Sequence, residues 1–289
     1  MRIDYGILKR KHTTNLCTNK KRMIQELEKQ KEDENVDAAY IFTGALGDQV
    51  CISGALNQYY LKFKKQIYII TNKPSLFAYQ DYCKEAIDIN FLSADGEDEQ
   101  SVIFKKFKKI YPLYWQTEKH LKGLNTIVEN YCDLLNVKKT KYPFFKIHEK
   151  DLIYNDRPFI LVSFKKPEDN VPFIVKKSKY FTNKTNDFLI KILQDNFKNF
   201  EIVDIGKIKT SNFYEILSIV AKCKTFVCVD TSLQHLAANE FCQKKGIVLW
   251  NNKTNIKLYG YEHNINLFND SVHPYNNYDI ILKNLKKIT

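Results

Sequence analysis

The sequence predicts an α/β protein built from two doubly wound domains. Short apolar runs alternate with amphipathic stretches along most of the chain, as expected for parallel strands joined by crossover helices. This alternation occurs twice, starting near Ala38 and again at Phe159. At 289 residues, 44% of them hydrophobic, the chain can bury two cores. We therefore expect a basic N-terminal appendage over residues 1–36, a first domain over 37–150 and a second over 151–289.

The first series opens with a strand from Ala38 to Phe42 that runs into the turn Thr43-Gly-Ala-Leu-Gly-Asp48. A helix follows from about Gln49 to Lys62. Gly44 and Gly47 suit such a turn because glycine lets backbone approach a ligand closely. The rest of the series is predicted as a strand at Gln66–Thr71, a helix at Ser75–Glu85, a strand at Ile87–Leu92, a lysine-rich helix at Ser101–Ile110, a longer helix at Glu118–Leu135 and a linker over 136–158.

The second series has the same alternation and ends in a short helix. Its predicted elements are strands at Phe159–Phe164, Glu201–Ile205, Phe226–Val229, Ile247–Trp250 and Asn264–Phe268, and helices at Asn183–Asn199, Ser211–Lys222, from Leu233, and at Tyr278–Lys287. A polar, lysine-rich loop is expected between residues 165 and 182. The whole pattern indicates two Rossmann-like sheets.

The most informative unit is the strand that stops at Asp230-Thr231-Ser232 and continues as a helix. In an open parallel sheet the ligand crevice lies at the carboxyl ends of the strands, so these three side chains should sit at that edge. His235 follows one turn later, roughly opposite the apolar face of the helix. A purely structural interpretation stays open: Asp230 or Thr231 can cap this helix, His235 can be a surface histidine, and Asp48 can cap the first helix.

The charge and the cysteine content indicate which kinds of partner and which cellular compartment to expect. The net charge is +12, but only four of the 45 basic residues are arginine, the residue that nucleic-acid surfaces favour. We expect no nucleic-acid partner and leave attraction to an anionic membrane open. The seven scattered cysteines form no C-x-x-C pair, which indicates free thiols and a reducing compartment. With no long apolar run, the chain is expected in the cytoplasm, with peripheral association at the inner face of the membrane left open.

Three local patterns resemble the ADP-heptose:lipopolysaccharide heptosyltransferases, glycosyltransferases of the GT-B type. Gly44-Ala-Leu-Gly-Asp48 is similar to the family's L-G-D turn, and Asp230-Thr-Ser-Leu-Gln-His-Leu-Ala-Ala238 to its D-[ST]-G-x-x-H-[LI]-A-A segment. Lys179-Tyr-Phe-Thr182 is a looser match to its K-x-W-P element. The chain departs from the family at Ser232, Gly54 and Asn251, where the family has glycine, proline and phenylalanine.

This resemblance implies a GT-B fold and a site shared by two domains. Asp48 would be the catalytic base, and Asp230, Thr231, Ser232, His235 and Lys179 would hold the nucleotide-sugar donor. Because a helix start and a lysine can neutralise the leaving diphosphate, and no D-x-D stands at a strand end, we expect neither a metal nor another cofactor.

The sequence leaves three functions open. The first is an inverting glycosyltransferase that acts on a cell-surface glycolipid or glycan. The second is a non-catalytic GT-B-like protein that binds a sugar or a partner, and the third is another nucleotide-sugar enzyme such as an epimerase. Asp48 favours the first, since a binding protein has no need of a carboxylate in that turn.

Overall fold

The computed structural model describes residues 36–42, 45–90, 107–147, 157–164, 183–210, 212–268 and 278–289. The predicted appendage, apart from Val36, lies outside the described residues, as do Gly44 and Lys179.

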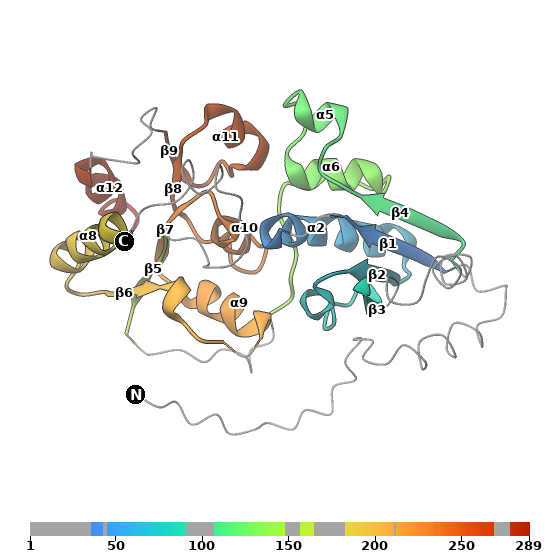
Figure 1. The fold of residues 1–289 in the computed structure, drawn as a ribbon, viewed down its shortest axis with the longest axis horizontal. Coiled ribbons are helices and arrows are strands. Elements are labelled where there is room, and N and C mark those ends of the chain that lie inside the picture. The colour runs from blue at the N-terminus through green and yellow to red at the C-terminus, as the bar shows by residue number, and fades with distance from the viewer. Residues whose placement is uncertain are drawn as a thin grey trace, which may run out of the picture.

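The first half of the chain forms a four-stranded parallel sheet (Figure 1). Its strands are β1 (Asp37–Ile41), β2 (Ile67–Thr71), β3 (Cys83–Asp88) and β4 (Lys109–Leu113), in the order β3-β2-β1-β4. The strand order reverses between β1 and β4, and such a switch point is where α/β sheets bind ligands.

The second half forms a five-stranded parallel sheet in the order β6-β5-β7-β8-β9. The strands are β5 (Phe159–Ser163), β6 (Glu201–Asp204), β7 (Thr225–Val229), β8 (Gly246–Trp250) and β9 (Ile265–Phe268). Here the switch point lies between β5 and β7. The residues that follow β7 therefore stand at the expected ligand edge of this sheet.

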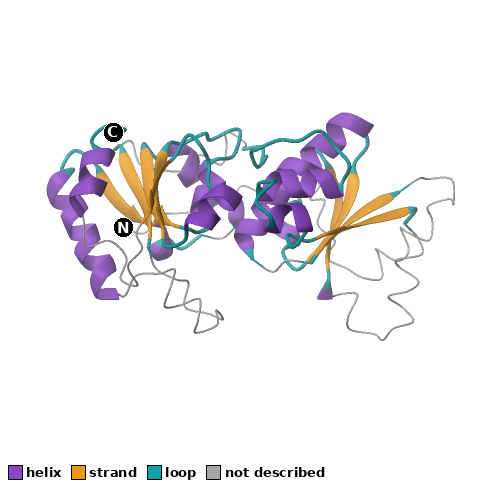
Figure 2. Cartoon of the chain, turned by 90° about the horizontal axis from the view of Figure 1, so that it is seen from above, coloured by secondary structure: helices purple, strands orange, loops and turns teal. Residues whose placement is uncertain are grey.

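The two sheets are joined by a middle layer of helices, visible edge-on in Figure 2. Helices α2 (Leu46–Phe63) and α6 (Ile127–Leu134) cover the first sheet, and α9 (Phe213–Lys222) and α10 (Ser232–Ala237) cover the second. One hydrophobic core runs through all four helices and the inner faces of both sheets. On its outer face the second sheet carries α8 (Asn183–Asn196) and α12 (Tyr278–Leu285). The prediction of a GT-B type α/β fold with two Rossmann-like sheets is confirmed.

Four predictions for the first half are wrong, three of them before residue 114. The segment predicted as a helix at Ser75–Glu85 holds the short 3-10 turn η1 (Pro74–Leu76), and β3 begins at Cys83 rather than Ile87. Phe77 and Tyr82 are buried in the core, so side-chain packing outweighs helical propensity there. The end of the predicted helix at Ser101–Ile110 belongs instead to β4, which pairs with β1 along its whole length.

The predicted helix Glu118–Leu135 is two helices, α5 (Glu118–Leu121) and α6. Gly123 breaks it in a left-handed conformation with φ of 69°, and Thr126 then begins α6 with a capping box. In that box the Thr126 hydroxyl accepts from the Glu129 backbone N–H, and the Glu129 carboxylate accepts from the Thr126 N–H. The second half also contains α11 (Lys253–Tyr259), which the sequence analysis did not predict.

One face of α2 carries the small residues Gly47, Cys51 and Gly54, which share a side of the helix at spacings of four and three. A Cβ on Gly54 would lie 2.3 Å from the Tyr142 carbonyl oxygen, and one on Gly47 would lie 3.0 Å from His235 Cδ2. Both distances are too short for an ordinary contact, so glycine at these positions lets α2 lie close to the linker and to α10. The close Tyr142 carbonyl explains why position 54 is glycine here, where the heptosyltransferases that the sequence resembles have proline.

The linker is also fixed to the second half by Asn239. The buried Asn239 side chain accepts from the Phe145 N–H and donates to the Phe145 carbonyl, both at 2.9 Å. Since both backbone groups are satisfied by one amide, the linker is held against the end of α10.

Free thiols are confirmed for the cysteines that the structure describes, which are Cys51, Cys83, Cys132, Cys223, Cys228 and Cys242. In the same part of the chain, no helix combines the length and the apolar character needed to cross a membrane.

Candidate active site

Asp48 lies in the first turn of α2, at the carboxyl edge of the first sheet. The helix begins at Leu46, three residues earlier than predicted, and its N-cap residue is Ala45. The alternative that Asp48 caps this helix is therefore wrong. Its carboxylate is half-buried and sits where the helix dipole favours a negative charge.

Asp230 and Thr231 lie between β7 and α10, at the corresponding edge of the second sheet. Asp230 is buried and accepts a hydrogen bond of 2.9 Å from the side-chain amide of Gln234. Thr231 occupies the N-cap position of α10, yet its hydroxyl makes no capping bond and is buried without a partner among the described residues. Ser232 is the first residue of α10, and its Cα would lie 3.6 Å from a Cβ on Gly47.

His235 is buried between the two halves, so the interpretation of it as a surface histidine is wrong. Its ring lies against Gly47 and contacts Cys51 of α2 and Tyr261, which follows α11. The helical pattern placed His235 away from the apolar face of α10, and that side of the helix packs on α2. Its burial therefore follows from the tertiary contact.

The charges of Asp48 and Asp230, which belong to opposite halves of the molecule, raise the pKa of the same buried groups. Burial raises the pKa of the Cys51 thiol, and the charges of Asp48 and Asp230 raise it further. The pKa of the Tyr259 hydroxyl is raised by the same three causes. Because the effect of a charge falls with distance, both carboxylates must lie near Cys51 and Tyr259.

Three aromatic residues join this site that the sequence analysis missed. Tyr131 of α6 is fully buried, burial and then the Asp48 charge raise its pKa, and its hydroxyl has no partner among the described residues. Burial lowers the pKa of His120, whose ring nitrogens lie 3.1 Å from the Asn125 carbonyl and 3.5 Å from the Tyr259 hydroxyl. Tyr259 is the last residue of the unpredicted helix α11, so no sequence signal placed it here.

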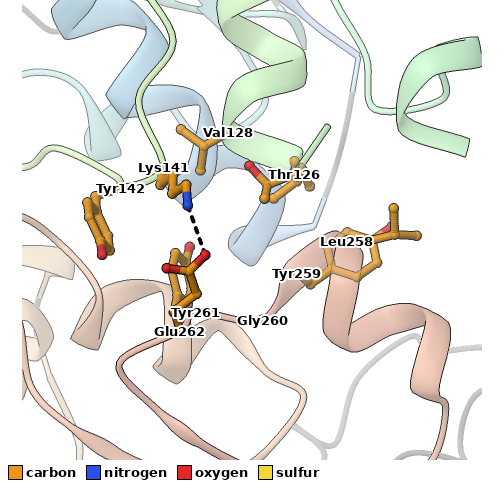
Figure 3. Close-up of a pocket in the computed structure, with 10 residues that line it drawn as sticks. Thr126, Val128, Lys141, Tyr142, Leu258, Tyr259, Gly260, Tyr261 and Glu262 are labelled. Atoms are coloured by element: carbon orange, nitrogen blue, oxygen red, sulfur yellow. Dashed lines mark hydrogen bonds and ion pairs between the residues drawn. The ribbon is translucent and has the colours of Figure 1, made fainter. Parts of the chain in front are cut away.

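A pocket of about 40 Å³ opens beside these residues, between the start of α6, the linker and the segment from Leu258 to Glu262 (Figure 3). Lys141 and Glu262 form an ion pair of 2.9 Å across it, and the ring of Tyr142 stacks on that of Tyr261. A volume of this size holds only about three water molecules, so the pocket does not accommodate a nucleotide sugar. It borders the site through Tyr259 and Tyr261.

Among the described residues no group of three or more histidine, cysteine or acidic side chains is arranged to hold a metal ion. Lys179, the cation predicted to contact the donor, lies outside the described residues, so its role stays a prediction. The described site therefore consists of two carboxylates, two histidines, a thiol and several buried hydroxyl groups.

Two Rossmann-like parallel sheets that pack together through a layer of helices are the architecture of the GT-B fold. Among solved structures, the chain is similar to Escherichia coli ADP-heptose LPS heptosyltransferase II, with a TM-score of 0.63 and 13% identity, over 88% of this chain and 98% of that one. It is also similar to E. coli heptosyltransferase WaaC with ADP, with a TM-score of 0.62 and 12% identity, over 88% of this chain and 100% of that one.

A third similar structure is the iron-containing dodecameric glycosyltransferase TibC from enterotoxigenic E. coli. The TM-score is 0.58 at 12% identity, over 88% of this chain and 73% of that one. No protein-family model and no curated protein sequence matches the chain. At these identities the likeness establishes the fold.

Proposed function

We propose that this protein is an inverting, metal-independent glycosyltransferase that moves a heptose or hexose from a nucleoside-diphosphate donor to a cell-surface glycolipid or glycan. One observation carries the proposal: Asp48 and Asp230 come from the switch-point edges of different sheets and act on the same buried groups. The fold shared with solved heptosyltransferases supports it.

The two carboxylates have different tasks in this proposal. Glycosyl transfer needs a base for the acceptor hydroxyl, and the half-buried Asp48 on the first half is available for it. The donor sugar needs hydrogen-bonding groups, and Asp230, Thr231, Ser232 and His235 supply them from the second half. The unpaired hydroxyls of Tyr131 and Thr231 support a ligand here, because leaving a buried hydroxyl unpaired costs about 1–3 kcal/mol.

The proposal is tested by measuring which nucleotide sugar raises the melting temperature, across ADP-, GDP-, UDP- and CMP-sugars. A ligand at a concentration of 100 times its dissociation constant adds about 2.7 kcal/mol to the free energy of unfolding, which gives a measurable shift in the melting temperature. We expect ADP-heptose or a related ADP-sugar to produce it, because the similar proteins WaaC and TibC have been solved with ADP and with an ADP-heptose, respectively. No shift with any sugar nucleotide would contradict the proposal.

The two alternatives predict different behaviour. A non-catalytic binding protein would be stabilised by a sugar nucleotide but would not turn it over. An epimerase would convert the donor without an acceptor, and it would need more ionisable groups around the sugar than Asp48, Asp230 and His235 provide.

Activity is expected to survive excess EDTA. If helix backbone, hydroxyl groups and Lys179 carry the leaving diphosphate, removing divalent ions takes nothing from the site. The measurement is the release of nucleoside diphosphate before and after chelation, with an Mg²⁺-dependent kinase as a control for the chelator. Because TibC is described as iron-containing, iron is added back together with Mg²⁺ and Mn²⁺. Loss of turnover that any of these ions restores would refute metal independence.

We further propose that the first half docks peripherally on an anionic membrane at the inner face, in the cytoplasm. Leu121, the last residue of α5, and Leu124 are 58% and 70% exposed. Lys119 and Lys122 lie beside them, in exposed ion pairs with Asp133 and Glu118. Apolar side chains next to lysines are what an anionic lipid surface attracts.

The double substitution Leu121→Glu with Leu124→Glu is expected to reduce vesicle binding at least about tenfold, since each buried leucine contributes about 1.5–3 kcal/mol. Flotation with phosphatidylcholine vesicles, with and without phosphatidylglycerol, measures the effect. Phe188→Glu on α8, which is 51% exposed in the other half, is the matched control. Equal flotation of the wild type and both variants would rule out this surface.

A further inference from the structure

Two buried side chains, Cys51 and Tyr261, meet at one nitrogen of the buried His235. The Tyr261 hydroxyl lies 2.8 Å from His235 Nδ1, and the Cys51 sulfur lies 3.3 Å from the same nitrogen. The Cys51 sulfur and the Tyr261 hydroxyl are 3.8 Å apart. Cys51 belongs to α2, His235 to α10 and Tyr261 to the segment after α11, so the contact spans both halves.

The imidazole ring is also fixed by packing. Tyr261 meets it edge to face, with centroids 5.6 Å apart and the planes at 76°. Tyr142 of the linker stacks on the other side of Tyr261, at 6.1 Å and 15°. The opposite edge of the imidazole, with Cδ2 and Nε2, lies 3.0 and 3.5 Å from the Cβ position of Gly47. The Nε2 edge therefore faces the start of α2, next to Asp48.

For a neutral imidazole, two hydrogen-bond arrangements fit these distances. Burial raises the pKa of both Tyr261 and Cys51, so the hydroxyl and the thiol keep their hydrogens. If Nδ1 carried the histidine hydrogen, the Tyr261 hydroxyl would accept it and could donate only to the sulfur at 3.8 Å, a long bond to a weak acceptor. If Nδ1 carries no hydrogen, the Tyr261 hydroxyl donates to it at 2.8 Å. The thiol, which is the weakest donor, is then left with the longer contacts of 3.3 and 3.8 Å.

We propose that Tyr261 is a positioning residue that holds neutral His235 in the Nε2–H form, so that His235 presents an N–H donor at the start of α2. It then donates a hydrogen bond to an oxygen and is not the general base. That use of the N–H rests on the proposed function, whereas the tautomer itself does not.

The tautomer can be read directly from the full-length protein labelled with ¹⁵N-histidine. Long-range ¹H–¹⁵N correlation spectra distinguish Nε2–H from Nδ1–H, and His235→Gln identifies the signals of His235 among the six histidines. We expect the wild type to show Nε2–H. Tyr261→Phe keeps the ring but removes the donor, so the Nε2–H form should give way to a mixture. Tyr142→Phe, the matched control from the same stack, should retain it.

The wild-type spectrum alone tests the proposed tautomer, even if Tyr261→Phe does not fold. Nδ1–H in the wild type would overturn the proposal, and so would an unchanged Nε2–H signal in Tyr261→Phe. Titration with ADP-heptose is the second readout: Tyr261→Phe should weaken binding up to about tenfold and Tyr142→Phe should not, as expected for one misaligned hydrogen bond. If no sugar nucleotide binds but the tautomer is as predicted, the proposed function fails and the positioning role stands.

Discussion

Asp48→Asn is expected to lower the rate of sugar transfer by about 10² or more, while donor affinity stays near the wild-type value. Asparagine has the shape of aspartate but cannot take a proton from an acceptor hydroxyl. Because Asp48 is in the first turn and not at the N-cap of α2, its charge–dipole interaction with the helix is worth about 0.3–1 kcal/mol. The melting temperature should therefore change by no more than a few degrees.

The matched control is Glu262→Gln, which neutralises an exposed carboxylate at the rim of the neighbouring pocket. It should transfer sugar at the wild-type rate. Normal transfer by Asp48→Asn would show that Asp48 is not the base. A large fall in its melting temperature would show that the Asp48 charge stabilises the fold, contrary to this prediction.

Asp230→Ala is expected to weaken donor binding roughly 10- to 100-fold. A charged hydrogen-bond partner of a desolvated ligand is worth about 1.5–3 kcal/mol, and Asp230 is buried at the ligand edge of the second sheet. Calorimetric titration of the donor into both proteins measures the change. Unlike Asp48→Asn, this variant should lose affinity before it loses the chemical step.

Asp230 also accepts from the amide of Gln234, so a second variant must separate the two tasks. Gln234→Ala removes that internal hydrogen bond and leaves the carboxylate. If Gln234→Ala weakens the donor as much as Asp230→Ala, the effect comes from the local structure of α10. Unchanged affinity in Asp230→Ala would end its assignment to the donor site.

The strands of the second sheet, and β1 and β2 of the first, could be predicted because buried parallel strands are short, apolar and β-branched. All five strands of the second half lie within about one residue of their predicted positions. The errors in the first half come from tertiary packing that outweighs periodicity, such as the burial of the Phe77 and Tyr82 rings and the pairing of β4 with β1. The capping box at Thr126 was readable from the sequence as T-x-x-E and would have divided the long helix correctly.

The candidate site could be predicted only where it follows strand ends. Asp230 directly follows β7, and Asp48 lies in the first turn of α2, the helix that follows β1, so topology alone places both at a ligand edge. Cys51, Tyr131 and Tyr261 reach the site by packing between the halves, which no short-range pattern encodes. His235 shows the limit most clearly, since helical periodicity points it outward and α2 covers it.

The most direct test of the account is acceptor-dependent turnover by the wild-type protein. The donor that the thermal-shift panel identifies is incubated with a glycolipid extract and without it, and the released nucleoside diphosphate is measured. The account predicts release that requires the extract and forms a glycosylated lipid. A protein that binds the donor tightly yet releases no diphosphate with any extract would be a binding module, and the assignment as a glycosyltransferase would be wrong.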